Sequence, residues 1–154
     1  MSNRSLNGLL SVATLGVLAS VAALAPCAAV AHTAAPATTM NKDRVVMQVS
    51  DNDPGKWNLA LNNAHNLQQA LGAKNIDIEI VAYGPGIHML TADSVVGNRI
   101  GEAAETGVQI VACQVTMKSL KLTKNDMLDK VGYVPGGVIE IMHREQQGWA
   151  YIRP

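Results

Sequence analysis

Short apolar runs rich in β-branched residues alternate with segments of helical periodicity along most of the chain. Residues 44–49 and 76–82 are two such runs, and their length and composition predict strands. Between them, apolar residues recur every three or four positions, which predicts a helix that runs to about Leu71. Asp53 can cap the start of this helix, and Pro54 suits its first turn.

The same alternation continues to the C-terminus. Further strands are predicted at residues 108–112, 131–134 and 149–152. Helices or helical turns are predicted at residues 94–105, 116–120, 124–128 and 135–147. The Gly-rich segment 83–90 is expected to be a loop that leaves the second strand.

The order of these elements predicts the fold class. Chains in which strands alternate with helices form a mostly parallel sheet with helices on both faces. We therefore expect one doubly wound α/β domain with a five-stranded sheet over residues 42–154. Asp77 and Glu79 interrupt the second strand, so this strand is expected to lie nearer to an edge of the sheet than the first.

Residues 1–31 have the features of a secretory signal peptide. They carry one basic residue, Arg4, then an apolar stretch over residues 9–24 and the small-residue sequence Ala-Val-Ala at residues 29–31. We expect cleavage after this sequence, a flexible linker over residues 32–41, and export to the periplasm. A retained N-terminal anchor is the alternative.

Composition narrows the classes of function. The chain has 12 Lys and Arg against 12 Asp and Glu, which argues against binding to a nucleic acid. A hydrophobic content of 48% can fill a core, yet three Tyr and two Trp are the whole aromatic content. So small a domain is expected to gain apolar contacts as a homo-oligomer. No metal-binding, GxGxxG or GxSxG pattern occurs, so no metal and no cofactor are expected.

Cysteine content singles out one residue. Removal of the signal peptide takes away Cys27 and leaves Cys113 as the only cysteine of the mature chain. Cys113 follows the third predicted strand, and ligands of parallel sheets bind at the carboxyl ends of strands. A helical turn directly after Cys113 would favour its thiolate, so we predict a pKa below the ~8.5 of a free cysteine. The alternative is a buried, inert cysteine.

Loop residues at the same edge of the predicted sheet are candidates for ligand binding. Asn52 follows the first strand, and Tyr83 and His88 follow the second. Their side chains can donate or accept hydrogen bonds, and His88 can also exchange a proton near neutral pH. We therefore expect these three residues to shape a small-molecule pocket.

Several segments resemble the DsrE/DsrF-like family, and the Asn-rich first helix and the Gly-Trp-Ala-Tyr-Ile ending resemble its exported branch. These segments are residues 48–63, 79–86, 108–113, 132–136 and 148–154. The resemblance implies an α/β fold and a homo-oligomer, often a trimer or a hexamer. Relay members of the family carry persulfide sulfur on a cysteine at the end of a central strand, a position matched here by Cys113. Residues 114–118 differ from the small-residue run typical of those carriers.

Two hypotheses of function follow. In the first, the chain is an exported sulfur carrier that holds persulfide sulfur on Cys113 as its catalytic residue and exchanges it with a donor or acceptor protein. In the second, the chain is a non-catalytic, oligomeric module that binds a small molecule or a protein, and Cys113 has no chemical role. Neither hypothesis requires a cofactor, a nucleic acid or, after cleavage of the signal peptide, a membrane.

Overall fold

The computed structural model describes residues 42–154, and the predicted signal peptide and the predicted linker therefore lie outside the described residues. The strands are β1 (Asp43–Val49), β2 (Ile76–Ala82), β3 (Gln109–Cys113), β4 (Gly132–Val134) and β5 (Ala150–Ile152). The α-helices are α1 (Pro54–Leu71), α2 (Gly97–Glu105), α3 (Gln114–Ser119) and α4 (Gly137–Gln146). Two 3-10 helices, η1 (Gly84–Leu90) and η2 (Lys124–Asp126), complete the order of elements.

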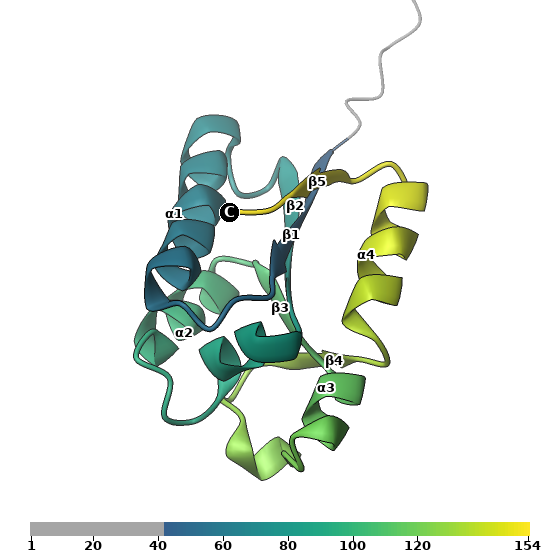
Figure 1. Cartoon of the computed structure of the whole chain (residues 1–154). Helices are drawn as coiled ribbons and strands as arrows, with labels where there is room; N and C mark the ends of the chain where they lie inside the picture. The colour runs from purple at the N-terminus through teal and green to yellow at the C-terminus, as the bar shows by residue number, and fades with distance from the viewer. Residues whose placement is uncertain (1–41) are drawn as a thin grey trace, which may run out of the picture. The chain divides into compact units, whose positions relative to one another are not determined.

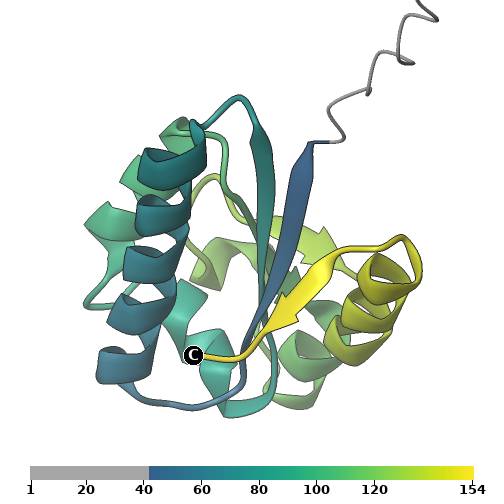
Figure 2. The same cartoon turned by 90° about the horizontal axis from the view of Figure 1, so that it is seen from above.

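All five strands are parallel and form one sheet in the order β4-β3-β2-β1-β5. The chain steps outward from β1 to β4, and α4 then carries it back across the sheet to β5 beside β1. Because such crossovers are right-handed, this reversal of direction places helices on both faces of the sheet. Figures 1 and 2 show α1 and α2 on one face and α4 on the other. The doubly wound α/β prediction is confirmed.

Helix α1 shows how local signals set the bounds of an element. The side chain of Asp53 accepts a hydrogen bond from the Gly55 N–H at 2.8 Å, and Pro54 opens the helix. Gly72, at φ 85°, ends it in the left-handed region that favours glycine. The predicted helix is therefore confirmed. Within residues 42–154, no helix combines the length and the apolar character that a membrane span requires.

Two predictions about local structure are wrong. Segment 83–90 is not an open loop, because residues 84–90 form the 3-10 helix η1, which buries Ile87, Met89 and Leu90. The second strand does not lie near an edge, because β2 is the middle strand of the sheet. Its Glu79 is tolerated there because the side chain, 1% exposed, forms an ion pair with Arg144 of α4.

The sheet has two unequal apolar faces. Toward α1, α2 and η1, side chains such as Met47, Ile80 and Ile110 belong to a large buried cluster, which we call the major core. Toward α4, a smaller buried cluster, the minor core, consists of Val46, Val81, Val111, Val134, Ile141 and Trp149. Alternate residues of each strand point to opposite faces, so Glu79 and Val81 share the minor-core face.

Candidate functional site

Cys113 lies where β3 ends and α3 begins. It is the last residue of β3 and the N-cap residue of α3. Its side chain is free of any disulfide and only 4% exposed. Because residues two positions apart share a face of a strand, Cys113 points to the same side of the sheet as Val111, toward α4.

Burial and nearby polar groups act in opposite directions on the thiol of Cys113. Burial raises the pKa of the thiol, whereas the Thr116 hydroxyl and the backbone N–H groups of Thr116, Gly137 and Val115 lower it. Together these polar groups outweigh the burial, and the pKa of Cys113 lies below its ordinary value. The donors come from the first turns of two helices, α3 and α4, whose aligned peptide dipoles also favour a negative sulfur.

Glycine at position 137 allows α4 to approach the thiol. A Cβ atom built on Gly137 would lie 2.9 Å from the Cβ of Tyr83, which is closer than real side chains come. Any other residue would therefore push the first turn of α4 away from the sheet, or displace Tyr83. Because Cys113 pairs with Val134, three residues before Gly137, this close packing also keeps the Gly137 N–H near the sulfur, where it lowers the pKa of the thiol.

Thr116 connects the thiol to a neighbouring groove. Its hydroxyl oxygen accepts a hydrogen bond from the Gly84 N–H at 2.9 Å, while the same hydroxyl contacts Cys113. The groove has a volume of about 450 Å³ and is lined by Asn52, Gly84, Pro85, His88, Val115, Thr116, Ser119 and Leu120. The structure thus brings two of the predicted ligand-binding residues, Asn52 and His88, to the same groove as Thr116.

Tyr83, the third predicted ligand-binding residue, does not line this groove. It packs against Gly137 and borders the minor core. Burial raises the pKa of its phenol, and the neighbouring Tyr151 acts in the same direction, whereas Arg153 lowers it. The side chain of Tyr83 therefore lies toward α4, against Gly137, whereas Asn52 and His88 line the groove.

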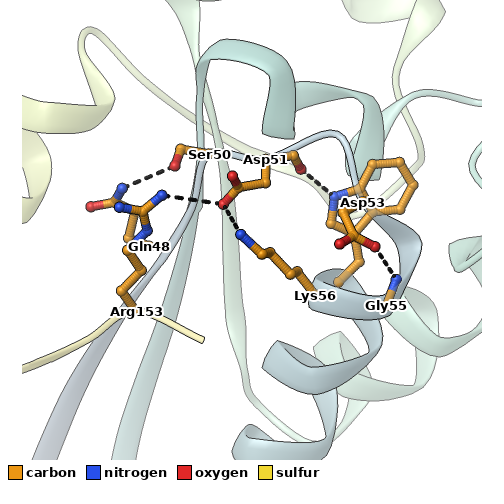
Figure 3. A network of polar contacts seen from close by, with 8 residues as sticks. Gln48, Ser50, Asp51, Asp53, Gly55, Lys56 and Arg153 are labelled. Atoms are coloured by element: carbon orange, nitrogen blue, oxygen red, sulfur yellow. Dashed lines mark hydrogen bonds and ion pairs between the residues drawn. The ribbon is translucent and has the colours of Figure 1, made fainter.

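A polar network lies beside Tyr83, at the carboxyl ends of β1 and β5 (Figure 3). Asp51 binds Lys56 at 3.1 Å and Arg153 at 3.4 Å, and the hydrogen bond from Lys56 contributes most to the lowered pKa of Asp51. Its carbonyl oxygen accepts the indole N–H of Trp57 at 2.7 Å. This network ties the loop after β1 to the C-terminal residues that follow β5.

Sequence reasoning missed the network because Arg153 and Asp51 are brought together only by the pairing of β5 with β1. The described residues contain no group of three His, Cys, Asp or Glu side chains placed to hold a metal ion. The polar groups that lower the pKa of Cys113 come from the protein backbone and from Thr116.

Comparisons with known proteins agree with this architecture. The model of the DsrE/DsrF-like family matches residues 45–154. The chain belongs to the DsrE/DsrF-like family. No curated protein matches the chain in a sequence comparison.

Two solved structures resemble this DsrE/DsrF-like chain. A protein of unknown function from Methanobacterium thermoautotrophicum is 35% identical with a TM-score of 0.69, and the match covers 73% of this chain and 99% of that protein. A conserved protein of unknown function from Bacteroides thetaiotaomicron is 16% identical with a TM-score of 0.53, and the match covers 75% and 98%. At that identity the second likeness shows the fold alone.

In this DsrE/DsrF-like chain the surroundings of the cysteine were harder to predict than its position. Cys113 stands at the end of a strand flanked by β2 and β4, as the spacing of the sequence indicated. Gly137 and Thr116 were not predicted as functional residues. Thr116 could have been found, because it occupies the third position of the predicted turn after Cys113, from which a side chain can reach back to the cap residue. Gly137 carried no comparable local signal.

Proposed function

We propose that the protein is an exported sulfur carrier that binds sulfane sulfur covalently on Cys113. The observation that carries the proposal is the place of Cys113 at the end of β3, as the N-cap residue of α3 and beside Val134, three residues before α4. The Thr116 hydroxyl and three backbone N–H groups there lower the pKa of the thiol. These donors stabilise a negative sulfur in a buried place, which is the state that attacks a sulfur donor. The resemblance to relay members of the DsrE/DsrF-like family supports the same role for Cys113.

The proposed transfer conserves atoms and electrons. The thiolate of Cys113 attacks the terminal sulfur of a persulfide donor, R–S–SH, and its electron pair forms the new S–S bond. The old S–S bond breaks, its electron pair leaves with the donor as R–S⁻, and Cys113 becomes a persulfide with no net oxidation. A thiolate of the acceptor then attacks the outer sulfur and releases Cys113 as a thiolate.

Burial of Cys113 limits what can reach it. The thiol is 4% exposed, so a bulky donor cannot contact the sulfur directly, whereas the terminal sulfur of a persulfide or a polysulfide can. The groove beside Thr116 is lined by the exposed apolar residues Val115 and Leu120, which suit a partner that must exclude water. Once loaded, the outer sulfur extends about 2 Å beyond the thiol sulfur, within reach of an acceptor.

Export and self-assembly are part of the proposal. The sequence of residues 1–31 supports cleavage near His32 and a periplasmic location, which N-terminal sequencing of the exported protein tests. Exposed apolar side chains on α3 and α4, Val115, Val138, Ile139 and Met142, support a homo-oligomer. Sedimentation at micromolar concentration tests this, and a monomer would argue against it.

Mass spectrometry tests the carrier function. The full chain is incubated with polysulfide, and peptides are mapped for an added sulfur atom. We expect the addition on Cys113, its loss in Cys113→Ser and its retention in Cys27→Ser, which serves as the matched control. Release of the added sulfur to a small thiol such as glutathione would show that the step is reversible.

The alternative is a binding module with a structural cysteine. The burial of Cys113 and the groove lined by Asn52 and His88 are the observations that favour it. In that case the thiol reacts with iodoacetamide only after denaturation, and no sulfur is added to the folded protein. Such a result would replace the carrier function by small-molecule binding in the groove.

A further inference from the structure

A buried ion pair holds the far end of the helix that contacts the thiol. Glu79, in the middle of β2, is the one charged residue buried to this degree among residues 42–154. Its carboxylate binds the Nε of Arg144, near the end of α4, at 2.5 Å. Arg144 also binds Glu140 at 2.8 Å, and its guanidinium lies 4.6 Å from the ring centre of Trp149. The guanidinium group of Arg144 therefore contacts three side chains.

Helix α4 has few other attachments to the sheet. Its buried residues are Gly137 and Ile141, and its side chains Val138, Ile139 and Met142 are exposed. Positions 137, 141 and 144 follow the spacing of one helical face, so Gly137, Ile141 and Arg144 form a single stripe toward the sheet. Gly137 approaches Tyr83, Ile141 enters the minor core, and Arg144 reaches Glu79.

The stripe ends at Gly137 near the thiol and at Arg144 in the ion pair, and a contact at one end affects the position of the other. Gly137 and Arg144 are seven positions apart, which corresponds to about 10 Å along a helix. Apolar packing around Ile141 resists separation of helix and sheet but sets little direction, whereas a charge-assisted hydrogen bond demands a defined distance and angle. The ion pair thus limits how far α4 can slide or turn, and the N–H of Gly137 at its other end moves with it.

We propose that Glu79 and Arg144 are positioning residues for the Cys113 thiolate. Their ion pair fixes the placement of α4 on the sheet, and this placement sets how close the Gly137 N–H, at the start of α4, lies to the sulfur. Cys113 pairs with Val134, only three residues before Gly137, so the start of α4 lies beside the thiol. The inference rests on the thiolate chemistry proposed above for Cys113, and it gives the carboxylate at the centre of the sheet a role. A neutral pair of similar volume would keep the helix attached without the same placement.

The pH dependence of iodoacetamide alkylation tests this inference. All variants are made in the full chain with Cys27→Ser, so that Cys113 is the only thiol. Glu79→Gln keeps the shape of the side chain but removes its charge. We expect the midpoint of the alkylation profile to move to higher pH and the rate near pH 7 to fall about fivefold, the effect of one hydrogen bond.

Two further variants keep the test decisive. Glu140→Gln removes the other carboxylate on Arg144 without touching the sheet, and we expect it to leave the profile unchanged. If Glu79→Gln does not fold, the double variant Glu79→Met with Arg144→Met leaves no unpaired buried charge and is expected to fold. This double variant should show the same shift of the midpoint.

The outcomes separate this inference from the proposed function. An alkylation profile that is the same in wild type, Glu79→Gln and the double Met variant overturns the positioning role, even if the wild type takes up sulfur. A wild-type thiol with a low pKa and the expected shift in the variants, but no sulfur uptake, supports the positioning role and overturns the carrier function. A wild-type thiol that titrates like a free cysteine overturns both.

Discussion

The two faces of the sheet are built on different principles. On the side of α1 and α2, the major core is a large cluster of buried apolar side chains. On the side of α4, one helix covers a minor core that is flanked by the buried Glu79, the thiol of Cys113 and the phenol of Tyr83. The first face supplies most of the apolar burial that stabilises the domain, and the second face carries the groups with chemistry.

The position of α4 links the second face to the thiol. Helix α4 packs over the minor core and begins three residues after Val134, which pairs with Cys113, so its N-terminus lies beside the thiol. Its buried residues are Gly137 and Ile141, and Arg144 adds the ion pair with Glu79. The predictions below separate the contributions of the two faces to stability and to thiol reactivity.

The largest expected effect belongs to the major core. Ile80 is fully buried in the middle strand and points toward the major core. Ile80→Ala should lower the free energy of unfolding by about 2–5 kcal/mol, because it leaves a cavity in a packed core. Urea denaturation measures this, and the folded fraction should keep the wild-type alkylation profile of Cys113. A shifted profile would mean that the two faces are not independent.

Two glycine-to-alanine changes contrast helices on opposite faces. Gly137→Ala in α4 should destabilise the protein by about 1–3 kcal/mol and slow alkylation of Cys113, because the new Cβ overlaps Tyr83. Gly101→Ala in α2 meets nothing within 4 Å and should stabilise it by about 0.5–1 kcal/mol, as alanine does inside a helix. Urea denaturation and alkylation measure both. Equal effects at the two positions would contradict the close approach of α4.

Thr116 tests the hydrogen bonds of α3 separately from those of α4. Thr116→Val keeps the shape of the side chain but removes the hydroxyl that contacts Cys113 and Gly84. We expect alkylation near pH 7 to slow about fivefold, because the thiolate loses one hydrogen bond. Thr116→Ser retains the hydroxyl and is the control. If both variants react like the wild type, the hydroxyl does not stabilise the thiolate.

The smallest expected effect is on the pH dependence of stability. Burial raises the pKa of Glu79 above its ordinary 4.5, and the ion pair with Arg144 offsets this only in part. A group whose pKa is higher in the folded state contributes stability below its unfolded pKa and loses that contribution as the pH rises through the folded value. Relative to Glu79→Gln, the wild type should therefore become less stable as the pH rises above 4.5.

Denaturant unfolding of the two proteins between about pH 4 and pH 8 measures this difference. The sign matters for the comparison of the two faces, because it means that the Glu79–Arg144 pair is kept at some expense of stability. A wild type that gains stability over Glu79→Gln with rising pH would instead make the pair an ordinary stabilising contact.

The candidate site was predictable in part. Cys113 could be placed at the carboxyl edge of the sheet because a β-branched run ends there and a helical turn follows. Asn52 and His88 could be placed near it because they follow neighbouring strands, and both line the groove beside Thr116. Tyr83 follows the same rule, but its side chain takes the other side of the strand end, against Gly137.

The sequence by itself determined the elements whose causes are local. Helix α1 begins at Pro54 and ends at Leu71 because a capping carboxylate, a proline and a glycine act within a few residues of its ends. The strands, their parallel arrangement and the fold class follow from periodicity and alternation along the chain, which are also local properties.

Only the tertiary structure decided the contacts between distant segments. The order of strands put β2 in the middle, where Asp77 and Glu79 had suggested an edge, because Arg144 neutralises Glu79 from 65 positions further along the chain. The same crossover placed Gly137 over Cys113 and Arg153 beside Asp51. Charge compensation and close packing depend on which surfaces meet, and that depends on the topology of the whole sheet.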